Sequence, residues 1–201
     1  MPSVGMTRAE GRRPRSWSLR RGGCAEPRGL DPIRLRDGSI VLIRPVRSTD
    51  APLLIDGFAR LSPQSRRMRF LIGKNELSAK ELHYLTDVDH HDHEAICAVD
   101  PLTGRGVGIA RYIRSADDAA AAEVAVTVVD EWQGRGLGVE LMAHLAQRAR
   151  EEGIRCFLAL VSADNRAVLA LMRRMDADVD LISYEHDTAA YEISLRVRQP
   201  C

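Results

Sequence analysis

The chain has 201 residues, 45% hydrophobic and 28% charged, with a formal net charge of +1, which is ordinary for a globular protein with one core-bearing domain. Its most apolar stretch, residues 119–129, is too short to span a membrane and contains Glu123, so we expect no membrane partner. The four cysteines lie far apart without a metal-like or redox-like spacing, which predicts reduced thiols in a cytoplasmic protein.

Residues 1–30 differ from the rest of the chain in composition. They contain seven arginines and two acids, with several Gly and Pro and few bulky apolar residues. Such a segment cannot bury enough apolar surface to fold, so we predict a disordered tail at 1–30 and one domain over 31–201. The tail carries a net charge of +5 and the rest of the chain −4. The domain therefore lacks the basic character of nucleic-acid-binding folds, and we expect no nucleic-acid partner.

The folded part begins with a strand and a group of helices. Asp37-Gly38 is a turn signal before an apolar strand at 40–46. Polar N-cap residues then introduce three helical segments, and Ser78 has Glu81 three residues later, which is the pattern of a capping box. The helices are predicted to extend to about residue 61, from 62 to about 70, and from 78 to 86.

The second half alternates strands and helices. Short apolar runs at 94–99, 107–114 and 122–129 predict three strands, the first two joined as a hairpin. A helical stripe begins at Leu137 and ends before Gly153, followed by a strand at 154–161, a helix at 164–175 and two final strands. This order predicts an α/β (α+β) domain built on a single mixed twisted sheet of about six to seven strands flanked by helices.

Two nearly identical glycine-rich segments raise the question of which one binds phosphate. Residues 104–108 read Gly-Arg-Gly-Val-Gly and lead into a strand, so we interpret them as a hairpin turn. Residues 134–138 read Gly-Arg-Gly-Leu-Gly and lie between an apolar strand and an amphipathic helix. That order aims free backbone N–H groups and the helix dipole at one point, which favours an anion site at the second segment.

With its preceding residue the second segment reads Q-x-x-G-x-G and resembles the pyrophosphate loop of the GNAT superfamily of N-acetyltransferases. The resemblance covers about residues 33–197, and the order of elements is similar to the GNAT fold. It implies acetyl-CoA as co-substrate, held by the loop residues Gln133, Gly134, Arg135, Gly136, Leu137, Gly138 and Val139.

Longer segments resemble the Pat-like protein-lysine acetyltransferases within that superfamily. They are "LRDGSIVLIRPVRSTDAPLL", "LSPQSRRMRF", "LTDVD" and "AEVAVTVVDEWQGRGLG". Some Pat-like proteins carry a cyclic-nucleotide-binding domain ahead of the acetyltransferase. The thirty tail residues are too few for such a domain, so they do not predict direct cyclic-nucleotide control.

Acetyl transfer to an amine needs a base, because a lysine amine with a pKa near 10.4 is neutral in only about one molecule in 10³ at pH 7. Glu123 is an acid in an otherwise apolar strand, and it stands where Pat-like enzymes have a catalytic glutamate. A solvent-exposed residue at the strand entry is the plainer interpretation of the same position. Asp130 and Glu131 are alternative bases, although their place in a turn suits capping roles better.

The resemblance also implies groups that hold the thioester. A backbone N–H late in the strand at 122–129, from Val128 or Val129, would stabilise the developing oxyanion if a strand irregularity freed it. Asn165 resembles an asparagine near the CoA arm and is also a good helix N-cap. Many of these enzymes have a tyrosine seven residues later as general acid, but this chain has Met172 there. The thiol of CoA therefore leaves as thiolate or takes its proton from water or another group.

A histidine cluster at 90–93 is the remaining candidate site. His90, His91 and His93 crowd together with acids, but neighbouring loop residues seldom supply metal ligands from different elements. We expect a solvated loop beside the acceptor cleft and no metal.

The sequence thus predicts an acetyl-CoA-dependent N-acetyltransferase that acts by direct transfer in a ternary complex, with protein lysines as acceptors. A small-molecule amine N-acetyltransferase and a non-catalytic CoA-binding regulatory module are the alternatives. The sequence leaves the oligomeric state open.

Overall fold

The computed structural model of the chain describes residues 31–71, 74–175 and 177–195. The predicted tail at 1–30 lies outside the described residues, as do Cys24 and Cys201. No helix in the described part of the chain is long and apolar enough to cross a membrane.

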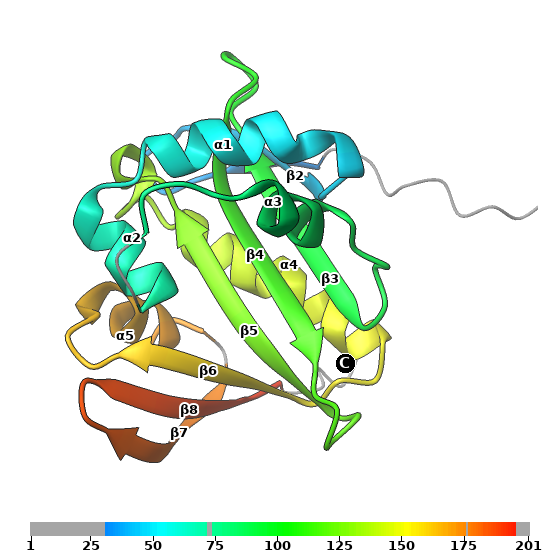
Figure 1. Ribbon diagram of the computed structural model, residues 1–201, viewed down its shortest axis with the longest axis vertical. Helices are drawn as coiled ribbons and strands as arrows, with labels where there is room; N and C mark the ends of the chain where they lie inside the picture. The colour runs from blue at the N-terminus through cyan, green and yellow to red at the C-terminus, as the bar shows by residue number, and fades with distance from the viewer. Residues whose placement is uncertain (1–30, 72–73, 176, 196–201) are drawn as a thin grey trace, which may run out of the picture.

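The described chain forms one eight-stranded sheet in the order β1-β2-β3-β4-β5-β6-β8-β7, shown in Figure 1. Neighbouring strands are antiparallel except β5 and β6, which run parallel. The strands are β1 (Asp31–Arg34), β2 (Ile40–Pro45), β3 (His93–Val99), β4 (Gly106–Arg114), β5 (Ala121–Val128), β6 (Cys156–Ser162), β7 (Asp178–Glu185) and β8 (Thr188–Ser194).

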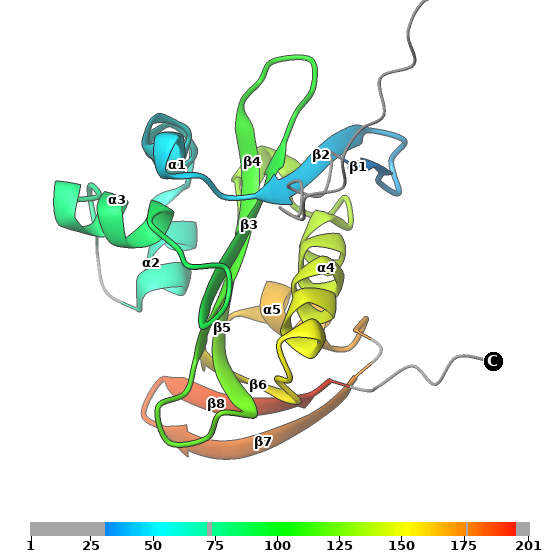
Figure 2. The ribbon, with the colours of Figure 1, turned by 90° about the vertical axis from the view of Figure 1, so that its right-hand side faces the viewer.

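Helices cover both faces of the sheet. Figure 2 shows α1, α2 and α3 on one face and α4 and α5 on the other. The helices are α1 (Ala51–Ala59), α2 (Pro63–Phe70), α3 (Ala79–Thr86), α4 (Leu137–Glu151) and α5 (Arg166–Met172), with short 3₁₀ turns η1 (Ser48–Asp50) and η2 (Asp130–Trp132). The mixed sheet flanked by helices confirms the predicted fold class.

The predicted core stripe and two of the predicted caps are present. Leu137, Leu141, Leu145 and Ala149 of α4 are all buried against the sheet. Ser78 and Glu81 cap each other reciprocally at the start of α3, and Ser62 accepts the N–H of Ser65 in α2. Local side-chain chemistry therefore fixes where these helices begin.

The strand count differs from the sequence prediction, because the sheet has eight strands instead of six or seven. The additional strand is β1, which pairs with β2 around the Asp37-Gly38 turn. Four residues that include Pro32 are too short to show an alternating pattern, so only the pairing reveals the strand.

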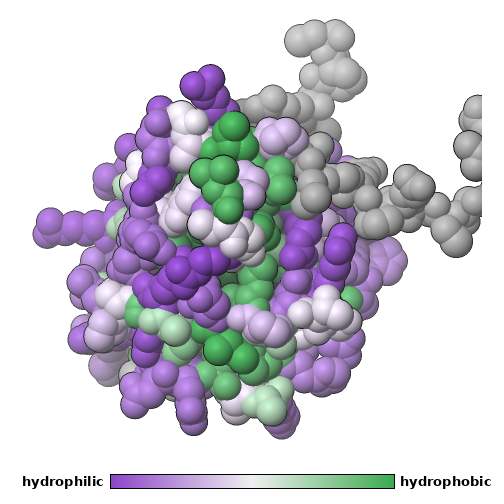
Figure 3. Space-filling model, turned by 90° about the horizontal axis from the view of Figure 1, so that it is seen from above, coloured by the Kyte–Doolittle hydropathy of each residue, from purple (hydrophilic) through white to green (hydrophobic). Residues whose placement is uncertain are grey.

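The first glycine-rich segment, residues 104–108, lies at the turn of the β3–β4 hairpin, as predicted. Gly104 has a φ of 69°, its N–H donates to the Asp100 carbonyl at 2.8 Å, and the Asp100 N–H donates to the Arg105 carbonyl at 3.0 Å. The hairpin lies at the end of the molecule viewed in Figure 3, where hydrophobic residues form a narrow band between hydrophilic areas.

The two parallel strands separate along their length. Their pairing covers only Ala121–Cys156, Ala122–Phe157 and Glu123–Leu158. Beyond Glu123 the strands diverge, as Figure 1 shows, and β5 continues along β4 while β6 continues along β8. The sheet therefore opens into a fork between β5 and β6.

Candidate active site

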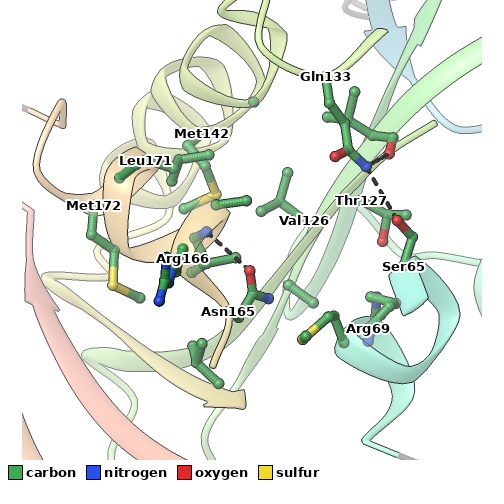
Figure 4. A pocket seen from close by; sticks show the side chains of 18 of the residues that line it. Ser65, Arg69, Val126, Thr127, Gln133, Met142, Asn165, Arg166, Leu171 and Met172 are labelled. Atoms are coloured by element: carbon green, nitrogen blue, oxygen red, sulfur yellow. Dashed lines mark hydrogen bonds between the residues drawn. The ribbon is translucent and has the colours of Figure 1, made fainter. Parts of the chain in front are cut away.

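A cavity of about 650 Å³ lies in the fork. Its walls come from the open edges of β5 and β6, the glycine loop at the start of α4, and residues of α2 and α5. Figure 4 shows it between Asn165, the N-cap of α5, and the Ser65 and Arg69 side chains of α2, with Val126 of β5 in the wall between them. Of the residues predicted to bind the co-substrate, the following line it: Val128, Gln133, Gly134, Gly136, Leu137, Gly138, Val139 and Asn165.

The glycine loop presents free backbone donors to this cavity. Gly134 and Gly136 have φ values of 76° and 96°, a conformation that glycine adopts without strain. Gly136 is the N-cap of the fifteen-residue helix α4, which has no side-chain cap. The Val139 N–H donates to the Gly136 carbonyl at 3.0 Å, while no backbone acceptor in the described residues takes the N–H groups of Leu137 and Gly138. Free donors and the helix dipole at a cavity wall form a site for an anion.

Gly138 lets α4 and α5 approach closely. A Cβ atom at this position would lie 2.7 Å from Leu171 Cδ1 of α5, far inside van der Waals contact. The same missing side chain keeps the cavity wall next to the loop open.

Gln133 and Arg135 hold the loop in place by different contacts. The Gln133 Nε2 donates to the Val128 carbonyl at 3.0 Å and to Ser65 Oγ at 3.3 Å. Arg135 turns away from the cavity: it donates to the Glu131 carbonyl, lies 3.2 Å from Asp37 and stacks over the Trp132 ring. Its side chain therefore clamps the loop from outside.

The register of β5 determines which backbone N–H groups face the fork. The Val129 N–H donates to the Val107 carbonyl of β4 at 3.1 Å. In an antiparallel pair such bonding alternates, so the N–H groups of Thr127 and Ala125 also point to β4, while those of Val128 and Val126 point to the fork. Val129 is therefore occupied, and Val128 is the candidate oxyanion donor that faces the cavity.

The strand irregularity expected near Val128 is absent from the described pairing of β4 and β5, which continues without a shift from Gly108–Val128 to Arg114–Ala122. The expectation of a local bulge was wrong. Divergence of β6 frees the same N–H groups, so β5 needs no bulge.

Glu123 lies at the fork but outside the cavity wall. It is the last β5 residue that pairs with β6, and its side chain is exposed. By alternation it shares a face with Ala125 and Thr127, of which Thr127 also lines a second cavity beneath α1. The carboxylate is therefore on the face covered by α1, α2 and α3.

The two alternative bases have structural partners. Asp130 accepts hydrogen bonds from the N–H and hydroxyl of Ser62 and from the Ser65 hydroxyl, at 2.8–2.9 Å. Burial raises the pKa of Asp130, but these hydrogen bonds outweigh it and the net pKa is lowered. Glu131 pairs with Arg60 at 2.7 Å. Both acids tie the loop after β5 to α1 and α2.

On the α5 side, Asn165 accepts the N–H of Val168 at 3.1 Å and so caps the helix. Met172, at the position where many enzymes of the resembling superfamily have a tyrosine, is buried and lines the cavity. No tyrosine of the described residues lines the cavity; Tyr184 is exposed on β7 and Tyr191 is half-buried on β8.

The histidines at 90–93 have separate partners. His90 Nδ1 lies 2.7 Å from the buried Glu94, His91 pairs with Glu152, and His93 Nε2 lies 2.7 Å from Arg111. Within the described residues no group of three or more acids, histidines or cysteines is arranged to hold a metal ion. His90, His91 and His93 line neither cavity, although His93 contacts Arg111, which lines the second one. The expected position beside the acceptor cleft stays a prediction.

Sequence reasoning missed several cavity residues. Ser65 and Arg69 of α2 and Arg166 of α5 line the cavity. The two α2 residues lie in the Pat-like segment "LSPQSRRMRF", but the resemblance gave neither of them a role in the site. Arg166 directly follows Asn165, and this adjacency was the available signal. Nothing local to α2 indicates that the helix reaches the fork, because that depends on how α2 packs against β5.

Comparison with known proteins agrees with this geometry. The acetyltransferase (GNAT) family matches residues 62–176. An acetyltransferase of Pseudomonas aeruginosa is 40% identical over 136 residues, which are 67% of this chain and 73% of that protein. The GNAT domain of S. lividans PAT superposes with a TM-score of 0.76 at 32% identity, covering 82% of this chain and 96% of that domain.

A third relative is longer than this chain. The acetyltransferase Pat of Mycolicibacterium smegmatis is 34% identical over 146 residues, which are 73% of this chain but 44% of that protein. The match thus spans less than half of the mycobacterial protein. The extent of the family match, together with the fork and its glycine loop, shows that this chain belongs to the GNAT family of N-acetyltransferases.

Proposed function

We propose that this enzyme transfers the acetyl group of acetyl-CoA to lysine side chains of proteins, directly and within a ternary complex. The family uses acetyl-CoA as donor. The observation that carries the acceptor assignment is the place of Glu123, which is exposed at the fork. A side chain extended from a protein surface can reach such a carboxylate without entering an enclosed pocket.

The residues of the fork suit the donor. The free N–H groups at the start of α4 would hold the pyrophosphate, and Gly134 and Gly136 let it approach the backbone. The N–H groups of Val126 and Val128 would bond the pantetheine arm and the thioester between β5 and β6. Asn165 and Arg166 border the same cavity from α5.

The chemistry requires a neutral amine. Glu123 would remove a proton from the lysine ammonium, directly or through a water molecule. The amine nitrogen then bonds to the thioester carbon, and the Val128 N–H stabilises the negative charge on the carbonyl oxygen. Collapse breaks the carbon–sulfur bond. The former amine nitrogen loses its second proton to water. The thiol of CoA leaves as thiolate or takes a proton from water or another group, because Met172 stands where a tyrosine could have supplied one.

Similarity to Pat of M. smegmatis and to the S. lividans PAT domain supports protein lysines as acceptors. A small-molecule amine is typically bound in a pocket that encloses it, and the exposure of Glu123 favours an open acceptor site instead. A CoA-binding module without turnover would have no use for the carboxylate at the fork.

Mass spectrometry tests the proposal. The protein is incubated with isotope-labelled acetyl-CoA and a cell lysate, alongside a Glu123→Gln control, and labelled peptides and small molecules are both recorded. We expect labelled lysines with the wild-type protein and far fewer with the variant. Label only in small amines would contradict the lysine assignment, and no label would contradict catalysis.

A further inference from the structure

Arg111 of β4 is a buried cation with incomplete hydrogen bonding. It is 5% exposed and points to the face covered by α3. Its Nη2 donates to the Leu85 carbonyl at 3.1 Å and lies 2.7 Å from His93 Nε2. Its Nε and Nη1 are buried without a hydrogen-bond partner in the described part of the chain. Buried guanidinium nitrogens of this kind normally have an acceptor.

Arg69 of α2 lies close to Arg111. Its guanidinium carbon is 5.1 Å from the centre of the Phe70 ring, and no hydrogen bond to its side chain is found among the described residues. Burial lowers the pKa of Arg69. Burial and then the charge of Arg69 lower the pKa of Arg111 to about 10. Two cations therefore share one poorly solvated region.

That region is a second, smaller cavity of about 80 Å³, which both arginines line. Its other walls are apolar residues, mostly of α1, α2, α3 and β4, together with Thr127 of β5, and no described acid lines it. Burying a charge without a partner is costly, so a site with two arginines and no acid favours an anion from outside the chain. Arg69 also lines the large cavity and therefore connects the two.

The arginines lie on the acceptor side of the fork. Arg111 is directly opposite Ala125, and Glu123 is two residues from Ala125 on the same face. Arg111 and Glu123 are thus diagonal neighbours, which are typically about 7–8 Å apart and somewhat closer at their Cβ atoms. An acceptor whose amine lies at the negatively charged Glu123 can therefore place a negative group against the positively charged Arg111, its diagonal neighbour.

We propose that Arg69 and Arg111 form a carboxylate subsite of the acceptor site, so that the enzyme selects amines whose carrier bears a carboxylate close by. This inference rests on the proposed acetyl transfer at Glu123. The carboxylate has two sources: an acidic side chain next to the target lysine of a protein, or the α-carboxylate of an amino acid. A carboxylate fits better than a neutral group because it supplies both charge and acceptor oxygens to the unpartnered nitrogens.

Matched acceptor pairs test the subsite. Lysine peptides with Glu or Gln beside the lysine form one series, and amino acids and their amides form the other. The wild-type enzyme is expected to prefer the carboxylate member by about tenfold or more in kcat/KM, a typical effect of charge-assisted hydrogen bonds. The series that shows the preference identifies the source.

Variants assign the preference to the arginines. Arg69→Met should abolish the preference for the carboxylate member of each pair, whereas Arg67→Met, an exposed position on the same helix, should retain that preference. Arg111→Met is the second variant; because it also loses the bond to Leu85, its folding is checked first. Equal use of both members of every pair by the wild-type enzyme would overturn the subsite.

A measurement without turnover separates this inference from the proposed function. Thermal unfolding is followed with glutarate or with the neutral glutaramide. Glutarate should stabilise the wild-type and Arg67→Met proteins more than glutaramide does, but not Arg69→Met. If glutarate stabilises the proteins in this way but no acceptor is acetylated, the proposed function is rejected and the anion subsite is retained. Equal effects of the two compounds on the wild-type protein would overturn the subsite.

Discussion

The Gln133 side chain joins the glycine loop to the open edge of β5, because its Nε2 lies 3.0 Å from the Val128 carbonyl oxygen. The same nitrogen lies 3.3 Å from Ser65 Oγ of α2. The Gln133 amide thus links the anion site at the start of α4 to β5, the strand that carries the candidate oxyanion donor. We expect this contact to help set the distance between the glycine loop and β5.

We predict that Gln133→Ala weakens CoA binding. A hydrogen bond of this kind contributes about 0.5–1.5 kcal/mol, so the Kd measured by calorimetry should rise by roughly two- to tenfold. Gln147→Ala, on the far part of α4, is the control and should leave the Kd unchanged. An unaltered Kd in Gln133→Ala would show that the loop keeps its position without this contact.

The two glycine loops allow a direct comparison. Gly136→Glu should abolish CoA binding, because it places bulk and negative charge at the anion site. Gly104→Glu is the matched control: its φ of 69° is also left-handed, and an added Cβ has no neighbour within 4 Å. In both variants the left-handed backbone destabilises the fold by a similar amount, about 1–2 kcal/mol. Because only Gly136 lies at the anion site, only Gly136→Glu should lose CoA binding in calorimetry. Loss of binding in both variants would point to destabilisation instead.

Replacing the candidate base should slow turnover without affecting the donor. We expect Glu123→Gln to lower kcat by about 10²-fold, the usual contribution of a general base. The KM for acetyl-CoA should stay the same, because Glu123 lies outside the donor cavity. Asp117→Asn replaces another exposed acid and serves as control in the same steady-state assay. A kcat close to the wild-type value would exclude Glu123 as the base.

The cap of α3 predicts a pH-dependent stability. Lys74 and then Ser78 hydrogen-bond to Glu81 and lower its pKa from 4.5 to about 2. A lowered pKa stabilises the folded state above about pH 4.5, and the stabilisation disappears as the pH falls towards 2.

Urea unfolding at several pH values measures this effect. Glu81→Gln should be less stable than wild type at neutral pH and equally stable near pH 2, while Glu76→Gln should show no such convergence. A difference between Glu81→Gln and wild type that is the same at all pH values would contradict the role of the charge.

The fold class and the glycine loop were predictable because they depend on local patterns. The 137–149 stripe indicates an amphipathic helix, and Gly136 before it supplies the conformation that an uncapped helix start needs. β1 was missed because four residues give too little periodicity. Its pairing with β2 depends on tertiary contacts.

The acceptor side of the site was not predictable in the same way. An arginine in a strand usually indicates a solvent-facing position, so nothing in "VGIARYIR" suggests that Arg111 is buried. The choice between Val128 and Val129 depends on which N–H groups pair with β4, and sequence alone gives no register. Such features appear only when α2, α3 and β4 are placed together.

The short pairing of β5 and β6 also has a mechanical consequence. Three residue pairs join a five-stranded half of the sheet to a three-stranded half, and beyond them the backbone groups that face the fork have no partner strand among the described residues. A donor molecule in the fork would take the place of the missing strand and bridge the halves. Occupancy would then stiffen the whole sheet, and amide exchange at Val126 and Val128 would report it directly.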